Sequence, residues 1–170
     1  MTLKAIVLHH LEYTFEKEAW QPSLLMAIDG LTSREAQWKP ASERHSTWQI
    51  VRHLTHWKRA TLGAWDGSQP LYDAATGPTE AAREAERTDW AEARGDDAAW
   101  RADREALLAV SEEIRKRVEA MPEAAFLEPF PGEDMPAVLR LLRMATHDIY
   151  HAGQIRYLRA LQGAYWQRGF

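Results

Sequence analysis

Two histidines, His147 and His151, stand four residues apart in the last third of the sequence. An α-helix turns once about every 3.6 residues, so side chains at this spacing lie on one face. Two neutral imidazoles on one helical face can bind a single metal ion. The same face would carry Met144, Ile155 and Leu158, so the imidazoles should be buried and need a metal or hydrogen-bond partners. By itself the pair is more often a pair of ordinary core or surface histidines.

A third ligand has to come from another helix, and the second predicted helix offers His53 and His56. His53 shares a helical face with Ile50 and Trp57, which indicates that it points inward. His56 leans toward two arginines, whose charges favour water. We therefore expect His56 to be a surface or rim histidine.

The remaining histidines are not expected at a metal site. His9 and His10 are consecutive, so their side chains point to different faces of a helix, and we interpret both as structural. His45 precedes the start of the second helix and is expected to be exposed. The candidate metal ligands are therefore His53, His147 and His151.

Three histidine ligands would leave at least one coordination position open, as in catalytic metal sites. An ion held by neutral ligands keeps its charge and lowers the pKa of a bound water or thiol. Imidazoles suit zinc, nickel or copper better than magnesium or calcium. Asp148 and Gln154 could orient the ligands, although Asp148 could equally be a surface carboxylate. No residue stands out as a catalytic acid or base, and no residues that bind another cofactor are predicted.

The elements that must position these residues are helices, because helical periodicity covers most of the chain and alternating strand patterns are missing. The first helix is expected over residues 2–30, closed by Gly30. Pro22 either kinks this helix or starts a new segment. A connection that contains Pro40 follows.

The second helix has a clear start, because Ser46 and Gln49 fit a capping-box pattern. It is expected to end at about Trp65. Residues 66–96 then form a long, partly acidic crossover with several glycines and prolines. Its Ala/Glu/Arg-rich part is interpreted as a solvated surface.

The third helix is expected over residues 97–121, with an apolar stripe at three- and four-residue steps: Leu107, Val110, Ile114 and Val118. Asp134 is expected to cap the fourth helix, with Pro136 in its first turn and Gly163 after its end. Four long helices with one long crossover between the second and third helices predict an all-α, four-helix bundle. The chain of 170 residues is long enough for one such domain over residues 1–170.

Composition narrows the functional classes. The net charge of −4 and the lack of a basic run argue against nucleic acid as a partner. The sequence has no cysteine, which excludes disulfides, a cysteine nucleophile and cysteine-based zinc sites. Neither a signal peptide nor a membrane-spanning segment is recognised, so we expect a cytoplasmic protein without a membrane partner. Eight tryptophans indicate a pocket or an interface but do not identify a ligand. The partner that we expect is a small-molecule substrate.

Two elements of the sequence together resemble the DinB/YfiT-like family of metalloenzymes, which is unrelated to the polymerase that shares the name. They are "STWQIVRHLTHW" and "HDIYHAGQIRYLR", preceded by "LLMAIDGLTSREAQWKP". The resemblance covers nearly the whole chain, although the crossover over residues 66–96 is less typical. It implies a four-helix bundle, often a homodimer, with zinc or nickel bound by His53, His147 and His151 at one end.

Characterised members of that family use an external thiol such as bacillithiol, mycothiol or glutathione. The resemblance therefore implies a thiol-dependent S-transferase-like activity on small electrophiles, with the thiol as a cosubstrate. Two alternatives stay open: a metal-dependent hydrolase, and a non-enzymatic metal-binding stress-response protein. A purely structural bundle with satisfied core histidines is the remaining alternative.

Overall fold

The computed structural model describes residues 1–68, 72–73 and 77–163. Most of this part of the chain is helical, and its only strands are two short ones, which confirms the predicted all-α class. The elements, in chain order, are α1 (Leu3–Phe15), α2 (Leu24–Ile28), α3 (Ser33–Ala36), α4 (Thr47–Trp65), β1 (Tyr72–Asp73), β2 (Gly77–Pro78), α5 (Glu80–Thr88), α6 (Asp97–Ala120), the 3₁₀ helix η1 (Glu123–Phe126) and α7 (Ala137–Leu161). No helix within these ranges is both long enough and apolar enough to cross a membrane.

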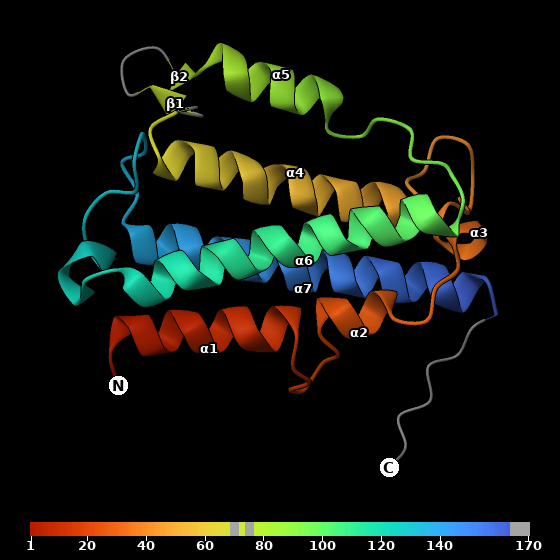
Figure 1. Cartoon of the computed structure of the whole chain (residues 1–170), viewed down its shortest axis with the longest axis horizontal. Helices are drawn as coiled ribbons and strands as arrows, with labels where there is room; N and C mark the ends of the chain where they lie inside the picture. The colour runs from red at the N-terminus through yellow and green to blue at the C-terminus, as the bar shows by residue number, and fades with distance from the viewer. Residues whose placement is uncertain (69–71, 74–76, 164–170) are drawn as a thin grey trace.

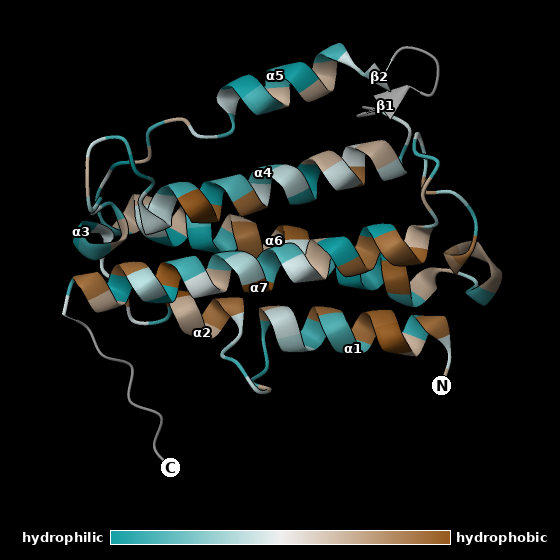
Figure 2. Ribbon diagram, turned by 180° about the vertical axis from the view of Figure 1, so that it is seen from behind, coloured by the Kyte–Doolittle hydropathy of each residue, from teal (hydrophilic) through white to brown (hydrophobic). Residues whose placement is uncertain are grey.

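The long helices α4, α6 and α7 run alongside one another (Figure 1). α1 and α2 lie against α7 on the side opposite α4 (Figure 1). α7 contacts α1, α2 and α4, so it takes part in many of the helix–helix contacts. α5 lies outside α4 and is mostly hydrophilic (Figures 1 and 2). Its small buried side is made of Ala82 and Ala85.

The first predicted helix is two helices, so a continuous helix over residues 2–30 is wrong. α1 ends at Phe15, and α2 begins after the N-cap Ser23. The Ser23 hydroxyl accepts a hydrogen bond from the Met26 amide and donates one to the Glu16 carbonyl, which joins the two helices. The alternative that a new segment begins near Pro22 is correct, because the proline precedes this cap.

The other helix boundaries agree with the sequence at all but one end. Ser46 and Gln49 form the predicted capping box at the start of α4, and Gly163 follows the last turn of α7 with a φ of 81°. Asp134 does not cap α7, so that prediction is wrong. The helix begins after Pro136, and the Ala137 amide donates instead to the Glu128 carbonyl over 2.9 Å.

Residues 66–96 contain more regular structure than predicted. β1 and β2 pair antiparallel, with Tyr72 opposite Pro78, and α5 follows. The chain then runs along α4 before it enters α6 (Figure 1). Residues 69–71 and 74–76 of this crossover lie outside the described residues.

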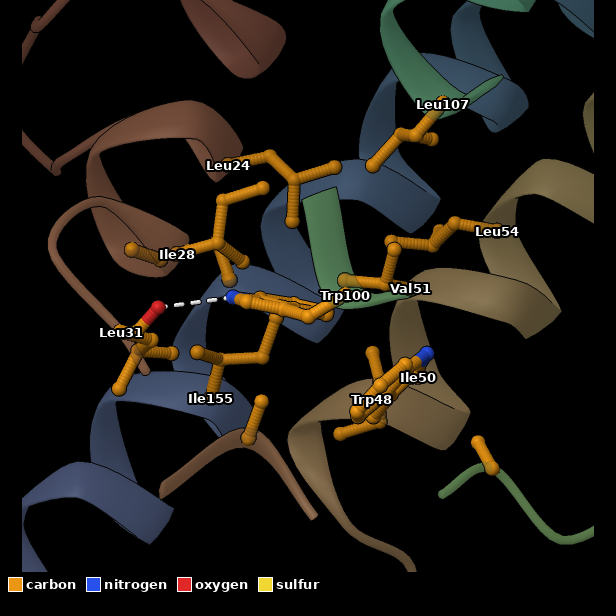
Figure 3. Close-up of a cluster of buried hydrophobic side chains, with 14 of the residues drawn as sticks. Leu24, Ile28, Leu31, Trp48, Ile50, Val51, Leu54, Trp100, Leu107 and Ile155 are labelled. Atoms are coloured by element: carbon orange, nitrogen blue, oxygen red, sulfur yellow. Dashed lines mark hydrogen bonds between the residues drawn. The ribbon is translucent and has the colours of Figure 1, made fainter. Parts of the chain in front are cut away.

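A buried apolar cluster supports one end of α4 and α7 (Figure 3). Trp100 from α6 is its central member, and its indole nitrogen donates to the Leu31 carbonyl over 2.8 Å. Ile50 of α4 and Ile155 of α7 belong to the same cluster and are buried. The predicted α6 stripe is buried as well, with Leu107 and Val110 in this cluster and Ile114 and Val118 in a second one. Burial of a large apolar side chain stabilises a fold by about 1.5–3 kcal/mol. The cluster therefore stabilises the parts of α4 and α7 that carry the histidines.

Candidate metal centre

α4 and α7 bring together the three histidines that the sequence analysis selected. Nε2 of His53 lies 3.0 Å from Nε2 of His147, which lies 2.9 Å from Nε2 of His151. His53 and His151 are buried, with 7% and 3% of their surface exposed, and His147 is half-buried. The three side chains form a group that could hold a metal ion.

Helical periodicity explains why these side chains meet. His147 and His151 lie one turn apart on α7, on the face that also buries Met144 and Ile155. Ile50, one turn before His53 on α4, is buried in the cluster of Figure 3. The apolar neighbours thus turn all three imidazoles toward the contact between the two helices.

Two of the imidazoles have a fixed hydrogen-bond acceptor behind them. Nδ1 of His53 lies 2.6 Å from a carboxylate oxygen of Asp89, and Nδ1 of His151 lies 2.7 Å from the side-chain oxygen of Gln154. Both partners accept, so each Nδ1 carries the hydrogen. In these two neutral imidazoles each Nε2 atom therefore carries a lone pair, which points into the cluster.

This arrangement fits a bound cation better than a set of hydrogen bonds. Two lone pairs converge on Nε2 of His147, which has at most one hydrogen to donate. Zinc–nitrogen bonds of about 2.0–2.1 Å at tetrahedral angles separate ligand nitrogens by about 3.3 Å. The two observed separations of 3.0 and 2.9 Å require the rings to move apart by only a few tenths of an ångström.

The electrostatic surroundings keep the imidazoles neutral. Burial, reinforced by the proximity of His53 and by the positive charges of Lys58 and Arg140, lowers the pKa of His147 to about 4. Burial and the neighbouring histidines lower the pKa of His151 to about 3. Burial also lowers the pKa of His53, against the opposing effect of Asp89. Neutral imidazole is the form that binds a metal.

The crossover contributes two residues that sequence reasoning missed. Asp89 accepts hydrogen bonds from both His53 and the indole of Trp57. The ring of Trp90 stacks on His53, with centroids 4.2 Å apart, and on His45, with centroids 3.8 Å apart. An acidic residue beside a tryptophan was the only signal for them, because this irregular segment has no periodicity that assigns a direction to its side chains.

The two candidate supporting residues on α7 differ in their roles. Gln154 orients His151, as the first alternative predicted. Asp148 makes no hydrogen bond to any described histidine but pairs with Lys58 of α4 over 2.7 Å. The alternative that Asp148 is a surface carboxylate is wrong, because its side chain is 1% exposed. Burial raises the pKa of Asp148, against the opposing effect of Lys58.

The other histidines stay outside the cluster. His9 and His10 on α1 are exposed. His56 is half-buried rather than fully at the surface, and no described residue makes a hydrogen bond with its buried Nε2. His45 is exposed, as predicted, but contributes to the wall above the cluster through its contact with Trp90.

A cavity of about 810 Å³ opens onto the three histidines. Its walls are mainly apolar and aromatic and include Ile50, Trp90, Tyr150, Tyr157 and Leu158. Tyr150 and Tyr157 are largely exposed at its mouth. Such a mixture of apolar walls and a few convergent polar groups is typical of sites for small molecules.

Comparison with known proteins gives one match. The sequence model of the DinB superfamily matches residues 17–155, a range that includes all three histidines, Asp89 and Gln154. No curated protein and no solved structure was found to match the chain.

Proposed function

Because the chain belongs to the DinB superfamily, we propose that it is a divalent-metal-dependent enzyme whose ligands are His53, His147 and His151. The observation that carries this proposal is the convergence of the three Nε2 atoms. Two of them carry a free lone pair, because Asp89 and Gln154 accept hydrogen bonds from the Nδ1 atoms of the same rings. The nitrogen-only ligand set favours zinc or nickel over magnesium or calcium.

We propose a thiol-dependent S-transferase-like activity on small electrophiles. A divalent ion with three neutral ligands lowers the pKa of a thiol that it binds, and the thiolate is the nucleophilic form. The chain has no cysteine, so the thiol has to enter as a cosubstrate. The cavity of about 810 Å³ has room for a small thiol and an electrophile together.

The residues around the cluster have distinct tasks in this proposal. Asp89 and Gln154 hold two of the imidazoles in one orientation, as partners of metal-bound histidines do. Ile50, Trp90 and Leu158 form apolar walls that limit the access of water to the thiolate. Tyr150 lies at the mouth, where it can contact the electrophile.

Elemental analysis of the purified wild-type protein and of His151→Ala tests the metal site. We expect about one zinc or nickel ion per chain in the wild-type protein and a large loss in the variant. Equal metal content in the two proteins would contradict the proposed ligand set.

Turnover separates the activities that this site could support. The metal-loaded protein is mixed with a chromogenic aryl halide, with and without glutathione or bacillithiol. Product that requires the thiol supports the transferase, whereas release of halide with water alone supports the hydrolase. A metal-loaded protein that is inactive on these and on ester substrates supports the non-enzymatic metal-binding alternative.

The proposal extends to the architecture and the assembly. We propose the four-helix bundle of the family, with α1 and α2 as one of its helices and the crossover between α4 and α6, acting in the cytoplasm as a homodimer. The exposed side chains of Tyr150, Tyr157 and Leu161 on α7 support an interface, because aromatic residues are enriched there. Light scattering at micromolar concentration tests it, and a monomeric mass would contradict the dimer.

A further inference from the structure

His147 also lines a second cavity, of about 280 Å³, between α4 and α7. Trp57, Lys58 and Thr61 border it from α4, and Arg140 and Arg143 border it from α7. The first cavity does not include these residues. The volume is several times the roughly 30 Å³ that one water molecule occupies, so a small molecule fits.

The polar groups of this second cavity are mostly cations and donors. Three cationic side chains, those of Lys58, Arg140 and Arg143, face one carboxylate, Asp148, which is paired with Lys58 over 2.7 Å. Outside the lining, Glu133 pairs with Nε of Arg140 over 2.9 Å. These two pairs leave a positive excess in the cavity.

Arg143 provides this excess. Its side chain is exposed, and no described residue forms an ion pair or hydrogen bond with it. Arg140 donates through Nη2 to the Thr61 hydroxyl over 3.0 Å, which fixes its guanidinium at the cavity wall. A planar guanidinium can bind an oxyanion through two parallel hydrogen bonds.

The imidazole of His147 lacks the support that the other two imidazoles have. No described residue accepts a hydrogen bond from its Nδ1, whereas His53 has Asp89 and His151 has Gln154. When Nε2 acts as a ligand, Nδ1 carries the hydrogen, and such N–H groups usually donate to an acceptor. Because His147 borders the second cavity, an acceptor held there can fill this role.

We propose that the second cavity binds a small oxyanion, a carboxylate or a phosphate, between Arg140 and Arg143 and beside the imidazole of His147. The anion neutralises the excess charge of the cavity whether or not a metal is bound, and it accepts a hydrogen bond from Nδ1 of His147 once Nε2 acts as a ligand and Nδ1 carries the hydrogen. Binding of the anion does not depend on a metal. Its coupling to the metal rests on the proposed function: an anion at this position reduces repulsion between the ion and the two arginines, so each strengthens binding of the other.

Calorimetric titration of the metal-free protein with inorganic phosphate, and separately with acetate, tests the site at low ionic strength. We expect saturable binding of at least one of the two, which also identifies the preferred oxyanion. In Arg143→Gln the dissociation constant should rise about tenfold or more, because a charge-assisted contact is lost. Arg101→Gln, which removes an exposed arginine from α6 outside every cavity described above, should bind as the wild-type protein does.

Nuclear magnetic resonance locates the bound anion. The ring nitrogens of His147, assigned with His147→Gln, should shift on titration, whereas those of the exposed His9 should not. Absence of saturable binding at millimolar concentrations of both anions would overturn the proposal. Binding that is equal in Arg143→Gln and Arg101→Gln, or that leaves the His147 resonances unmoved, would overturn it as well. None of these results depends on metal content, so they are distinct from a failure of the proposed metal site.

Discussion

Asp89 and His53 are joined by a hydrogen bond of 2.6 Å, although they lie 36 residues apart and in different segments of the chain. The second oxygen of the same carboxylate accepts from the Trp57 indole over 2.9 Å. Asp89 therefore connects the crossover to α4 at two points. The side chain is only 9% exposed, so water weakens these contacts little.

Replacement of Asp89 should weaken metal binding without removing a ligand. In Asp89→Asn the imidazole of His53 loses a charged hydrogen-bond acceptor. Loss of such a partner of a metal-bound histidine typically lowers metal affinity by about ten- to a hundredfold. We expect a rise of that size in the dissociation constant for zinc, measured by competition with a chromogenic chelator.

Glu92→Gln is the matched control for this variant. Glu92 lies on the same segment, but its carboxylate is largely exposed and pairs with Lys39. Zinc affinity should stay within about twofold of the wild-type value, because exposed ion pairs contribute little. If both variants lose affinity equally, the segment acts through its general charge and not through the contact with His53.

The two histidines of α4 should differ sharply in their importance. His53→Ala removes one of three proposed ligands, so its metal affinity should fall by orders of magnitude. His56 is outside the cluster, and its Nε2 has no hydrogen-bond partner among the described residues. His56→Ala should therefore keep its metal. Metal titrations of both variants at one pH test this, and loss of metal in His56→Ala alone would show that His56, and not His53, is the ligand from α4.

The histidine cluster could be predicted from sequence because helices impose a period. Once His147 and His151 are on a helix, their common face follows, and Ile50 sets the direction of His53. Asp89 carries no such information, because it follows the end of α5. Its side chain is positioned by tertiary contacts that only the folded chain provides.

The mistakes about helix ends have similar local causes. Residues 16–23 lack a strong breaker other than Pro22, so the sequence gives no signal that the helix ends at Phe15. At the start of α7, Asp134 has the right side chain for a cap, but a backbone carbonyl from Glu128 reaches the Ala137 amide instead. Side-chain preference was overridden here by a contact between residues nine positions apart.

The stability of the metal-free protein should decrease as the pH falls from 7 to 5. The pKa values of His147 and His151 are lowered to about 4 and about 3, while the unfolded chain titrates near 6.5. Between these values the unfolded state binds more protons, so protonation favours unfolding. Each histidine contributes at most about 1.4 kcal/mol per pH unit in this window.

Urea unfolding at several pH values measures this slope. The double variant His147→Gln/His151→Gln should have a flatter dependence between pH 5 and 7, since glutamine does not titrate. Above pH 7 the two proteins should both be insensitive to pH with respect to these groups. An unchanged slope in the double variant would assign the acid sensitivity to other residues.

Replacing one member of the buried pair Lys58–Asp148 should destabilise the fold more than replacing both members. Their side chains are 3% and 1% exposed, and Nζ lies 2.7 Å from the carboxylate.

Lys58→Met leaves Asp148 buried without its partner, which should lower the free energy of unfolding by about 3–5 kcal/mol. The double variant Lys58→Met/Asp148→Leu should recover most of that loss, because an apolar pair carries no desolvation penalty. Lys39→Met, which breaks the pair with the largely exposed carboxylate of Glu92, should cost no more than about 1 kcal/mol. Urea unfolding of the metal-free proteins gives all three values. A double variant as unstable as Lys58→Met would show that the two charges do not act as a pair.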